Sequence, residues 1–209
     1  MSRDILSAFL AAIFTLAAPA LAAAEPKTFQ VRADGGSRIQ FVSDAPLETI
    51  TGVSTAVTGQ VTFDTAAPAA ARGSVQVDTA SLRTGIDLRD EHLRSASWLD
   101  ARRFPRATFE IVAVEGATAL QPNRDAQVRV RGRFTLHGVA REVTSQATVR
   151  WVPLTDEMRR IPGMNGDALM VRATFTVTLT DFGVSVPTIV RLKVANQIQV
   201  DVRIRAISS

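Results

Sequence analysis

Residues 127–136 read QVRVRGRFTL, and this stretch decides the class of the fold. Polar residues, three of them arginine, alternate with Val128, Val130, Phe134 and Leu136, which therefore share one face of an extended chain. A period of two places successive side chains on opposite sides of a β-strand. The stretch predicts a strand that buries its apolar face and exposes its arginine face.

The same alternation recurs along most of the chain. Antiparallel strands with one apolar face must hide their edges, and closing into a barrel achieves this. We therefore expect an all-β fold, a closed or nearly closed antiparallel barrel of about eight strands. Strands are expected over residues 28–31, 38–41, 60–64, 74–78, 108–111, 127–136, 143–151, 169–179 and 197–204. The inward-facing candidates are Phe41, Val61, Phe63, Val75, Val77, Phe109, Ile111, Val130, Phe134, Leu136, Phe175 and Val177.

Short connectors separate the expected strands. Residues 34–37, Asp-Gly-Gly-Ser, predict a hairpin turn between the first two strands. His137 and Gly138 predict a turn in which Gly138 takes a positive φ. Residues 153–167 form the longest irregular stretch. No internal repeat or linker interrupts the pattern, so residues 25–209 are expected to form a single domain.

One segment departs from the strand pattern. Residues 84–104 read TGIDLRDEHLRSASWLDARRF. Asp87 is a candidate N-cap for a helix over residues 88–94, with Asp90 in the capping-box position. We expect a short helical excursion around residues 87–103, between an early and a middle strand.

The composition excludes several kinds of chemistry. The chain has 209 residues and no cysteine, which excludes disulfides, thiol nucleophiles and thiolate metal sites. Its net charge of +4 does not indicate a nucleic-acid partner. His92 and His137 are the only histidines, and we expect no metal site from them. Asp90 and His92 do not face each other on a helix, and no nucleophile elbow is present, so we expect no catalytic residue and no enzyme.

Residues 1–24 have the features of a secretory signal peptide. An apolar stretch over residues 5–16 is followed by Pro19 and a run of small residues that ends at Ala24. We therefore expect a cleaved leader, a mature chain without a membrane span, and a periplasmic or secreted location.

Several strings occur together in one order and are similar to a known family. The set resembles the YceI-like family of secreted bacterial proteins over about residues 28–205. The strings are residues 58–64 (TGQVTFD), 81–85 (SLRTG), 89–93 (RDEHL), 98–100 (WLD), 104–105 (FP) with Phe109, 132–139 (GRFTLHGV) and 181–184 (DFGV).

This resemblance implies a lipocalin-like barrel that holds a polyisoprenoid-type or quinone-like lipid in its lumen and catalyses no reaction. A bound lipid is then the partner, with no other cofactor. Arg83 and Arg89 lie near the helical segment and are the candidate contacts for a polar head group. The candidate contacts for the apolar ligand are Phe41, Phe63, Val77, Leu82, Leu93, Trp98, Phe104, Phe109, Val130, Phe134, Leu136 and Phe175.

Alternation by itself leaves two interiors open. The lumen is either packed with side chains or leaves room for a ligand, and Trp98 and Phe104 either plug one barrel end or line the tunnel. A filled barrel would indicate a non-catalytic interaction or stress-response module. An enzyme acting on lipid-linked substrates is the less favoured alternative. A homodimer is compatible with the sequence, and no residue pattern specifies one.

Overall fold

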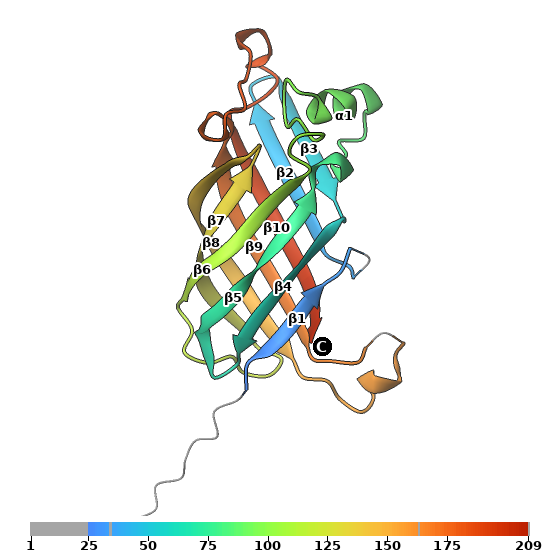
Figure 1. Cartoon of the computed structure of the whole chain (residues 1–209), viewed down its shortest axis with the longest axis vertical. Coiled ribbons are helices and arrows are strands. Elements are labelled where there is room, and N and C mark those ends of the chain that lie inside the picture. Colours follow the sequence, from blue (N-terminus) through green and yellow to red (C-terminus); the bar gives the residue numbers. More distant parts are fainter. Residues whose placement is uncertain (1–24, 34, 163, 209) are drawn as a thin grey trace, which may run out of the picture.

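Strands make up most of the molecule, and they wrap around a common axis (Figure 1). The computed structural model describes residues 25–33, 35–162 and 164–208, so the expected signal peptide lies outside the described residues. The strands are β1 (Lys27–Val31), β2 (Arg38–Ala45), β3 (Glu48–Ser54), β4 (Val57–Asp64), β5 (Ala67–Asp78), β6 (Arg106–Glu115), β7 (Asp125–Leu136), β8 (Val139–Val152), β9 (Ala168–Thr178) and β10 (Gln197–Ser208). The helices are α1 (Asp87–Arg94) and the single 3-10 turns η1 (Thr79–Ser81), η2 (Met158–Arg160), η3 (Leu179–Phe182) and η4 (Thr188–Val190).

Eight strands close the barrel. The hydrogen-bonded order runs β1-β4-β5-β6-β7-β8-β9-β10, and β1 pairs back with β10 to complete the ring. All of these pairs are antiparallel, and Val31 lies opposite Ala206 at the closure. This arrangement confirms the predicted closed antiparallel barrel of about eight strands.

The prediction of a hairpin between the first two strands was wrong. β1 and β2 both pair with β10, one after the other and in the same direction, so they are two pieces of one interrupted edge. Ser37 secures the interruption, because its Oγ accepts from the Arg205 backbone N–H at 3.0 Å and lies 3.2 Å from the Arg205 carbonyl oxygen. A glycine-rich loop favours a change of path, but only the partner strand decides whether the chain reverses.

β3 was not predicted as a strand, and it pairs with β2 in a hairpin. The edge of β3 meets the segment before α1 through a single bridge between Val53 and Arg83, with hydrogen bonds of 2.8 and 2.9 Å. The Ser54 and Ser81 hydroxyls lie 2.6 Å apart beside it. The β2–β3 hairpin therefore extends the barrel wall at the end that carries α1.

The outer face of the barrel is polar, as the alternation predicted. Arg131 pairs with Glu142 at 3.3 Å, and Arg133 pairs with Glu110 at 3.8 Å on neighbouring strands. Both pairs are largely exposed, so each contributes little to stability. Among the described residues, no helix combines the length and the apolar character that a membrane crossing requires.

Helix α1 lies where the sequence predicted it, but its cap differs. The N-cap is Ile86, which makes no side-chain cap bond, and Asp87 is already helical. Asp90 does not close a capping box. Its carboxylate instead accepts hydrogen bonds from the backbone N–H and hydroxyl of Thr84 at 2.7 and 2.6 Å. The sequence pattern placed the helix correctly, while the loop before it decided the partner of Asp90.

The turn between β7 and β8 matches its prediction. His137 and Gly138 have φ values of 51° and 75°, which is the left-handed region. A Cβ added at Gly138 would lie 2.4 Å from the ring of Phe104, so glycine also makes room for this aromatic side chain.

Candidate functional site

The barrel encloses a cavity of about 840 Å³. This volume lies toward the upper end of the roughly 300–1,000 Å³ range of small-molecule sites. Val61, Val75, Ile111 and Val130 point into the cavity, yet they are only half-buried. Side chains that face inward and remain accessible line an open lumen, so the barrel is not filled by its own side chains.

Most of the residues predicted to contact a ligand lie on the cavity wall. They come from the strands and from the helical segment, which the fold brings to one lumen although they are far apart in the sequence. The predicted contacts found there are Phe41, Phe63, Val77, Leu82, Leu93, Trp98, Phe109, Val130, Phe134, Leu136, Phe175 and Arg89.

Two predicted contacts are not on this wall. The ring of Phe104 packs edge-on against the His137 ring, with 4.7 Å between the centroids, and so supports the β7–β8 turn. Arg83 is exposed, and its Nη1 donates to the carbonyl oxygens of Ala80 and Leu82 at 2.7 and 2.9 Å. Both residues stabilise the segments that carry them.

Two glycines keep the lumen wide. A Cβ added at Gly52 would lie 2.1 Å from the Phe41 ring, and one added at Gly132 would lie 2.3 Å from the Phe109 ring. Each phenyl ring therefore lies against the backbone of a neighbouring strand, in the space that a side chain at the glycine would occupy. The missing side chains at these two positions create space for the rings beside the lumen.

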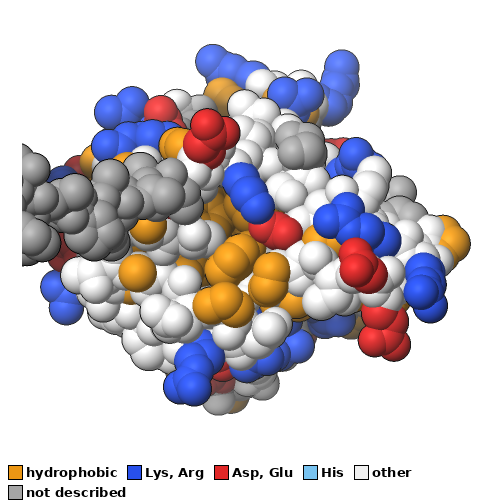
Figure 2. Space-filling model, turned by 90° about the horizontal axis from the view of Figure 1, so that it is seen from below, with side chains coloured by type: hydrophobic (Ala, Val, Ile, Leu, Met, Phe, Trp, Pro, Cys, Tyr) orange, Lys and Arg blue, Asp and Glu red, His pale blue; other side chains and the backbone are white. Residues whose placement is uncertain are grey.

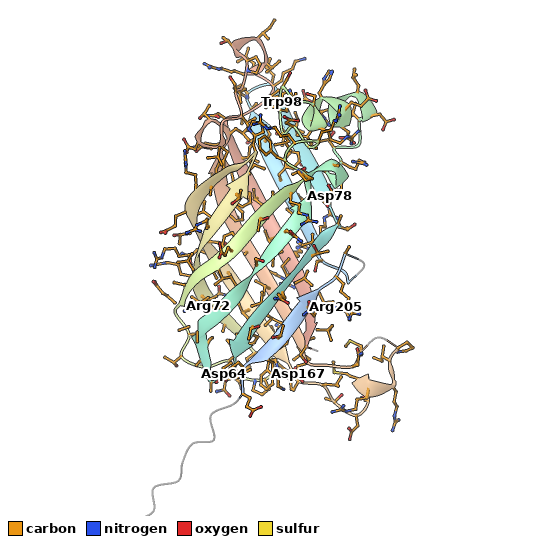
Figure 3. All side chains as sticks on the ribbon, viewed as in Figure 1. Asp64, Arg72, Asp78, Trp98, Asp167 and Arg205 are labelled. Carbon is orange, nitrogen blue, oxygen red and sulfur yellow. The ribbon has the colours of Figure 1, made fainter. Side chains whose placement is uncertain are left out.

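The cavity reaches the surface at the end of the barrel that carries α1. Ile86 and Leu88 line the cavity there and are 53% and 62% exposed. At the opposite end the lining residues Phe63, Ala71 and Leu120 are buried. Figure 3 shows Trp98 at the α1 end and Asp167 at the other end.

Polar groups on the cavity wall gather near this opening. Arg89 on α1 pairs with Glu48 at 2.7 Å and donates from Nε to the Thr84 hydroxyl at 2.9 Å. Burial acts to raise the pKa of Asp90, but the hydrogen bonds from Thr84 and the nearby Arg83 and Arg94 hold that pKa below its ordinary value. Asp90 therefore ties α1 to the segment before it, and Arg89 ties α1 to Glu48 of β3.

The opposite end is held by Asp167. Its carboxylate accepts hydrogen bonds from Lys27 Nζ at 2.7 Å, Trp151 Nε1 at 3.1 Å and the Leu154 N–H at 2.8 Å. Burial acts to raise the pKa of Asp167, and these donors, Lys27 foremost, lower it overall. Viewed from this end, apolar side chains gather at the centre between charged ones (Figure 2).

Part of the wall near the opening comes from segments that the alternation did not predict. Glu48 and Ile50 come from the unpredicted strand β3, while Val190 and Lys193 come from the segment between β9 and β10. The DFGV string of residues 181–184 was the one sequence signal close to Val190 and Lys193. In the structure its Phe182 and Val184 are buried, and the Phe182 ring packs edge-on against Phe134 with 5.5 Å between the centroids. Those residues anchor the segment over the lumen.

The arrangement suits one apolar ligand with a polar end. The wall is apolar along the strands, and its charged groups lie beside the opening, where Arg89, Glu48 and Thr84 bind one another. Within residues 25–33, 35–162 and 164–208, no three His, Asp or Glu side chains lie close enough to hold a metal ion.

A closed eight-stranded antiparallel barrel with an apolar lumen belongs to the lipocalin-like class of architectures. The model of the YceI-like domain matches residues 30–206. The chain therefore belongs to the YceI-like family, as its sequence motifs indicated.

Curated relatives share part of this chain. A UPF0312 protein of Pseudomonas putida (strain W619) is 36% identical over 129 residues, which cover 62% of this chain and 60% of the relative. A UPF0312 protein of Enterobacter sp. (strain 638) is 39% identical over 90 residues, which cover 43% of each protein. The match thus spans about 60% or less of the length of these relatives.

Solved structures share the fold at low sequence identity. The polyisoprenoid binding domain from Saccharophagus degradans, implicated in plant cell wall breakdown, has a TM-score of 0.67 and 19% identity, and the match covers 88% of this chain and 100% of that one. BcnA of Burkholderia cenocepacia has a TM-score of 0.65 and 21% identity, and the match covers 84% of this chain and 98% of BcnA. At these identities the likeness shows the fold.

Proposed function

We propose that this protein holds an isoprenoid-type lipid in the lumen of its barrel and catalyses no reaction on it. The open apolar cavity of about 840 Å³ carries this proposal. The family membership and the polyisoprenoid binding domain from Saccharophagus degradans support the ligand class.

The shape of the lumen favours a long, narrow ligand. Strand β7 has 12 residues. At roughly 3.4 Å per residue it is about 40 Å long, and a tilt of roughly 35–45° leaves about 30 Å along the barrel axis. An extended apolar chain follows such a lumen, with its polar end beside Arg89 and Glu48 at the opening.

The free energy of burial favours long chains over short ones. Each CH₂ group moved from water into an apolar site contributes about 0.8 kcal/mol, so a tail of about 20 carbons gains up to roughly 16 kcal/mol. Association costs about 4–15 kcal/mol. A tail of about 8 carbons gains only roughly 6 kcal/mol and gives little net affinity.

Organic extraction of the purified protein tests the proposal. We expect mass spectrometry to find one long-chain isoprenoid lipid per protein molecule after purification from a bacterial periplasm. Ala173→Trp places an indole in the lumen and is expected to abolish the lipid, since Ala173 lines the cavity. Thr176→Trp, on the exposed face of the same strand, is the matched control and is expected to retain it.

An empty extract from folded wild-type protein would overturn the proposal and favour an interaction module. Equal lipid content in the Ala173→Trp variant would show that the lipid binds outside the lumen. Turnover of a lipid-linked substrate would contradict the non-catalytic part.

We propose that the mature protein lies in the periplasm or outside the cell. The signal-peptide features of residues 1–24 support this location. Fractionation of the producing bacterium, with N-terminal sequencing of the mature chain, is expected to find the protein outside the cytoplasm and without these residues. A full-length chain in the cytoplasm would contradict it.

A further inference from the structure

Large apolar side chains are exposed around the opening of the cavity. Single exposed apolar residues are ordinary on a protein surface, whereas a group around a cavity entrance marks a site of interaction. Ile189 is 92% exposed, and the other four of the group are each more than half exposed. The group is Leu47, Ile86, Leu88, Ile189 and Leu192.

Three separate segments bring this group together. Leu47 lies in the β2–β3 turn, and its N–H donates to the carbonyl oxygen of Leu192 at 2.8 Å. Leu192 belongs to the β9–β10 loop (residues 179–196), which Figure 1 shows beyond the strand ends on the same side as α1. Ile86 and Leu88 line the cavity itself, together with Val190 of the β9–β10 loop. The exposed apolar surface is therefore continuous with the lumen.

The charges near the opening differ between its two sides. Arg191 and Lys193 flank Leu192 in the β9–β10 loop, both are exposed, and no acidic residue occurs from residue 182 to residue 200. Asp87 and Glu91 lie exposed on α1. The β9–β10 loop is thus the cationic and apolar side of the opening, whereas α1 carries charges of both signs, because Arg89 and Arg94 lie on the same helix.

We propose that the β9–β10 loop docks this protein on a bilayer that contains anionic phospholipid, with Ile189 and Leu192 inserted among the acyl chains. Arg191 and Lys193 lie beside these two side chains and match the negative charge of the headgroups. This inference rests on the proposed lipid-holding function, because docking lets an apolar ligand move between the bilayer and the lumen without crossing water.

Vesicle co-sedimentation tests the docking. Wild-type protein is expected to bind vesicles of phosphatidylcholine mixed with phosphatidylglycerol, to bind pure phosphatidylcholine vesicles more weakly, and to lose binding as salt rises. The double variant Ile189→Ser with Leu192→Ser is expected to bind the mixed vesicles at least about 10-fold more weakly. Arg191→Glu with Lys193→Glu is expected to remove the preference for anionic lipid.

Ile161→Ser is the matched control, because Ile161 is 51% exposed in the connection between β8 and β9, which meets the opposite end of the barrel at Asp167. It is expected to bind like wild type. Equal binding of the Ile189→Ser and Leu192→Ser variant and wild type overturns the docking. Self-association that these two substitutions abolish, without vesicle binding by wild type, also overturns it and assigns the surface to a second copy.

Lipid content separates this inference from the proposed function. The Ile189→Ser and Leu192→Ser variant is expected to retain co-purified lipid, since neither side chain lines the cavity. Co-purified lipid without vesicle binding by wild type overturns the docking and leaves the proposed function in place. Vesicle binding by a protein that carries no lipid overturns the proposed function and retains the docking surface.

Discussion

At the end of the barrel opposite α1, the buried carboxylate of Asp167 connects several separate segments. Lys27 of β1, Trp151 of β8 and the Leu154 backbone all donate to it. Its own N–H donates to Ser208 Oγ at 2.9 Å. One residue therefore ties the start of the barrel, its end and the irregular stretch of residues 153–167.

Replacement of Asp167 by Asn is expected to lower the free energy of unfolding by about 1.5–3 kcal/mol at neutral pH, because its charge-assisted hydrogen bonds are lost. In the wild type, the pKa of Asp167 is lower in the folded state than its unfolded value of about 3.9. The ionised carboxylate therefore stabilises the folded state above this pH, and the stabilisation is lost as the pH falls through the folded pKa. Urea unfolding should show a difference in stability between wild type and Asp167→Asn that shrinks below about pH 3.9.

The control for that measurement is Asp156→Asn, because the Asp156 side chain is 99% exposed. We expect Asp156→Asn to leave the free energy of unfolding nearly unchanged across the same pH range. A constant difference between Asp167→Asn and wild type across the acid range would contradict the assigned role of the charge.

At Gly52, two effects of a methyl group oppose each other. Gly→Ala at a compatible site stabilises by roughly 0.4–1 kcal/mol through the unfolded state. Here the new Cβ would lie 2.1 Å from the Phe41 ring. Overpacking costs about 1–3 kcal/mol, so the clash dominates. We expect Gly52→Ala to be less stable in urea and to carry less lipid, because the ring turns into the lumen.

The double variant Gly52→Ala with Phe41→Leu checks that explanation. The smaller leucine removes the clash, so part of the stability and lipid content should return. If the stability loss of the double variant equals the sum of the losses of the two single variants, the Phe41 ring and Gly52 act independently, and the explanation is wrong.

Among the elements, α1 is held to the barrel by few contacts. Asp90 accepts from Thr84, and Arg89 pairs with Glu48 of β3. Asp90→Asn is expected to weaken this attachment, so that α1 amides exchange about 10-fold faster in hydrogen-exchange measurements while the strands stay protected. Glu91→Gln, exposed on the same helix, is the control. Similar exchange in both variants would contradict the bracing role of Asp90.

The strands also show where a sequence pattern is sufficient to place an element. Strand β7 has a strong period of two, and the sequence placed it close to its observed range. Helix α1 was placed by the break in the strand pattern, although its cap differs from the predicted one. β3 includes TITGV over residues 49–53, in which Gly52 interrupts the apolar alternation, so no strand was predicted there. The charged and apolar residues that β3 contributes to the opening were missed for the same reason.

At the scale of the whole molecule, a ligand that binds the folded lumen stabilises the barrel. At a free ligand concentration of about 100 Kd the gain is about 2.7 kcal/mol. This corresponds to a rise in Tm of roughly 5–10 °C for a chain of this size. We expect delipidated protein to melt lower than lipid-loaded protein in calorimetry, and the Ala173→Trp variant to show no lipid-dependent shift. An equal shift in that variant would place the stabilising lipid outside the lumen.

The sequence by itself determined which residues of the predicted strands face inward. Alternation is a local property of an extended chain, so Val130, Phe134 and Phe175 were assigned to the lumen without knowledge of their neighbours. The family resemblance was also readable from short ordered strings, and the model of the YceI-like domain confirmed it.

Only the tertiary structure decided how those strands pair and what space they enclose. The shared edge of β1 and β2 on β10 and the packing of Phe104 on His137 depend on residues distant in sequence. The open lumen depends on rings that lie over glycines of neighbouring strands. The physical reason is that periodicity specifies the direction of a side chain, whereas pairing, cavity volume and the apolar rim of the opening arise from contacts between segments.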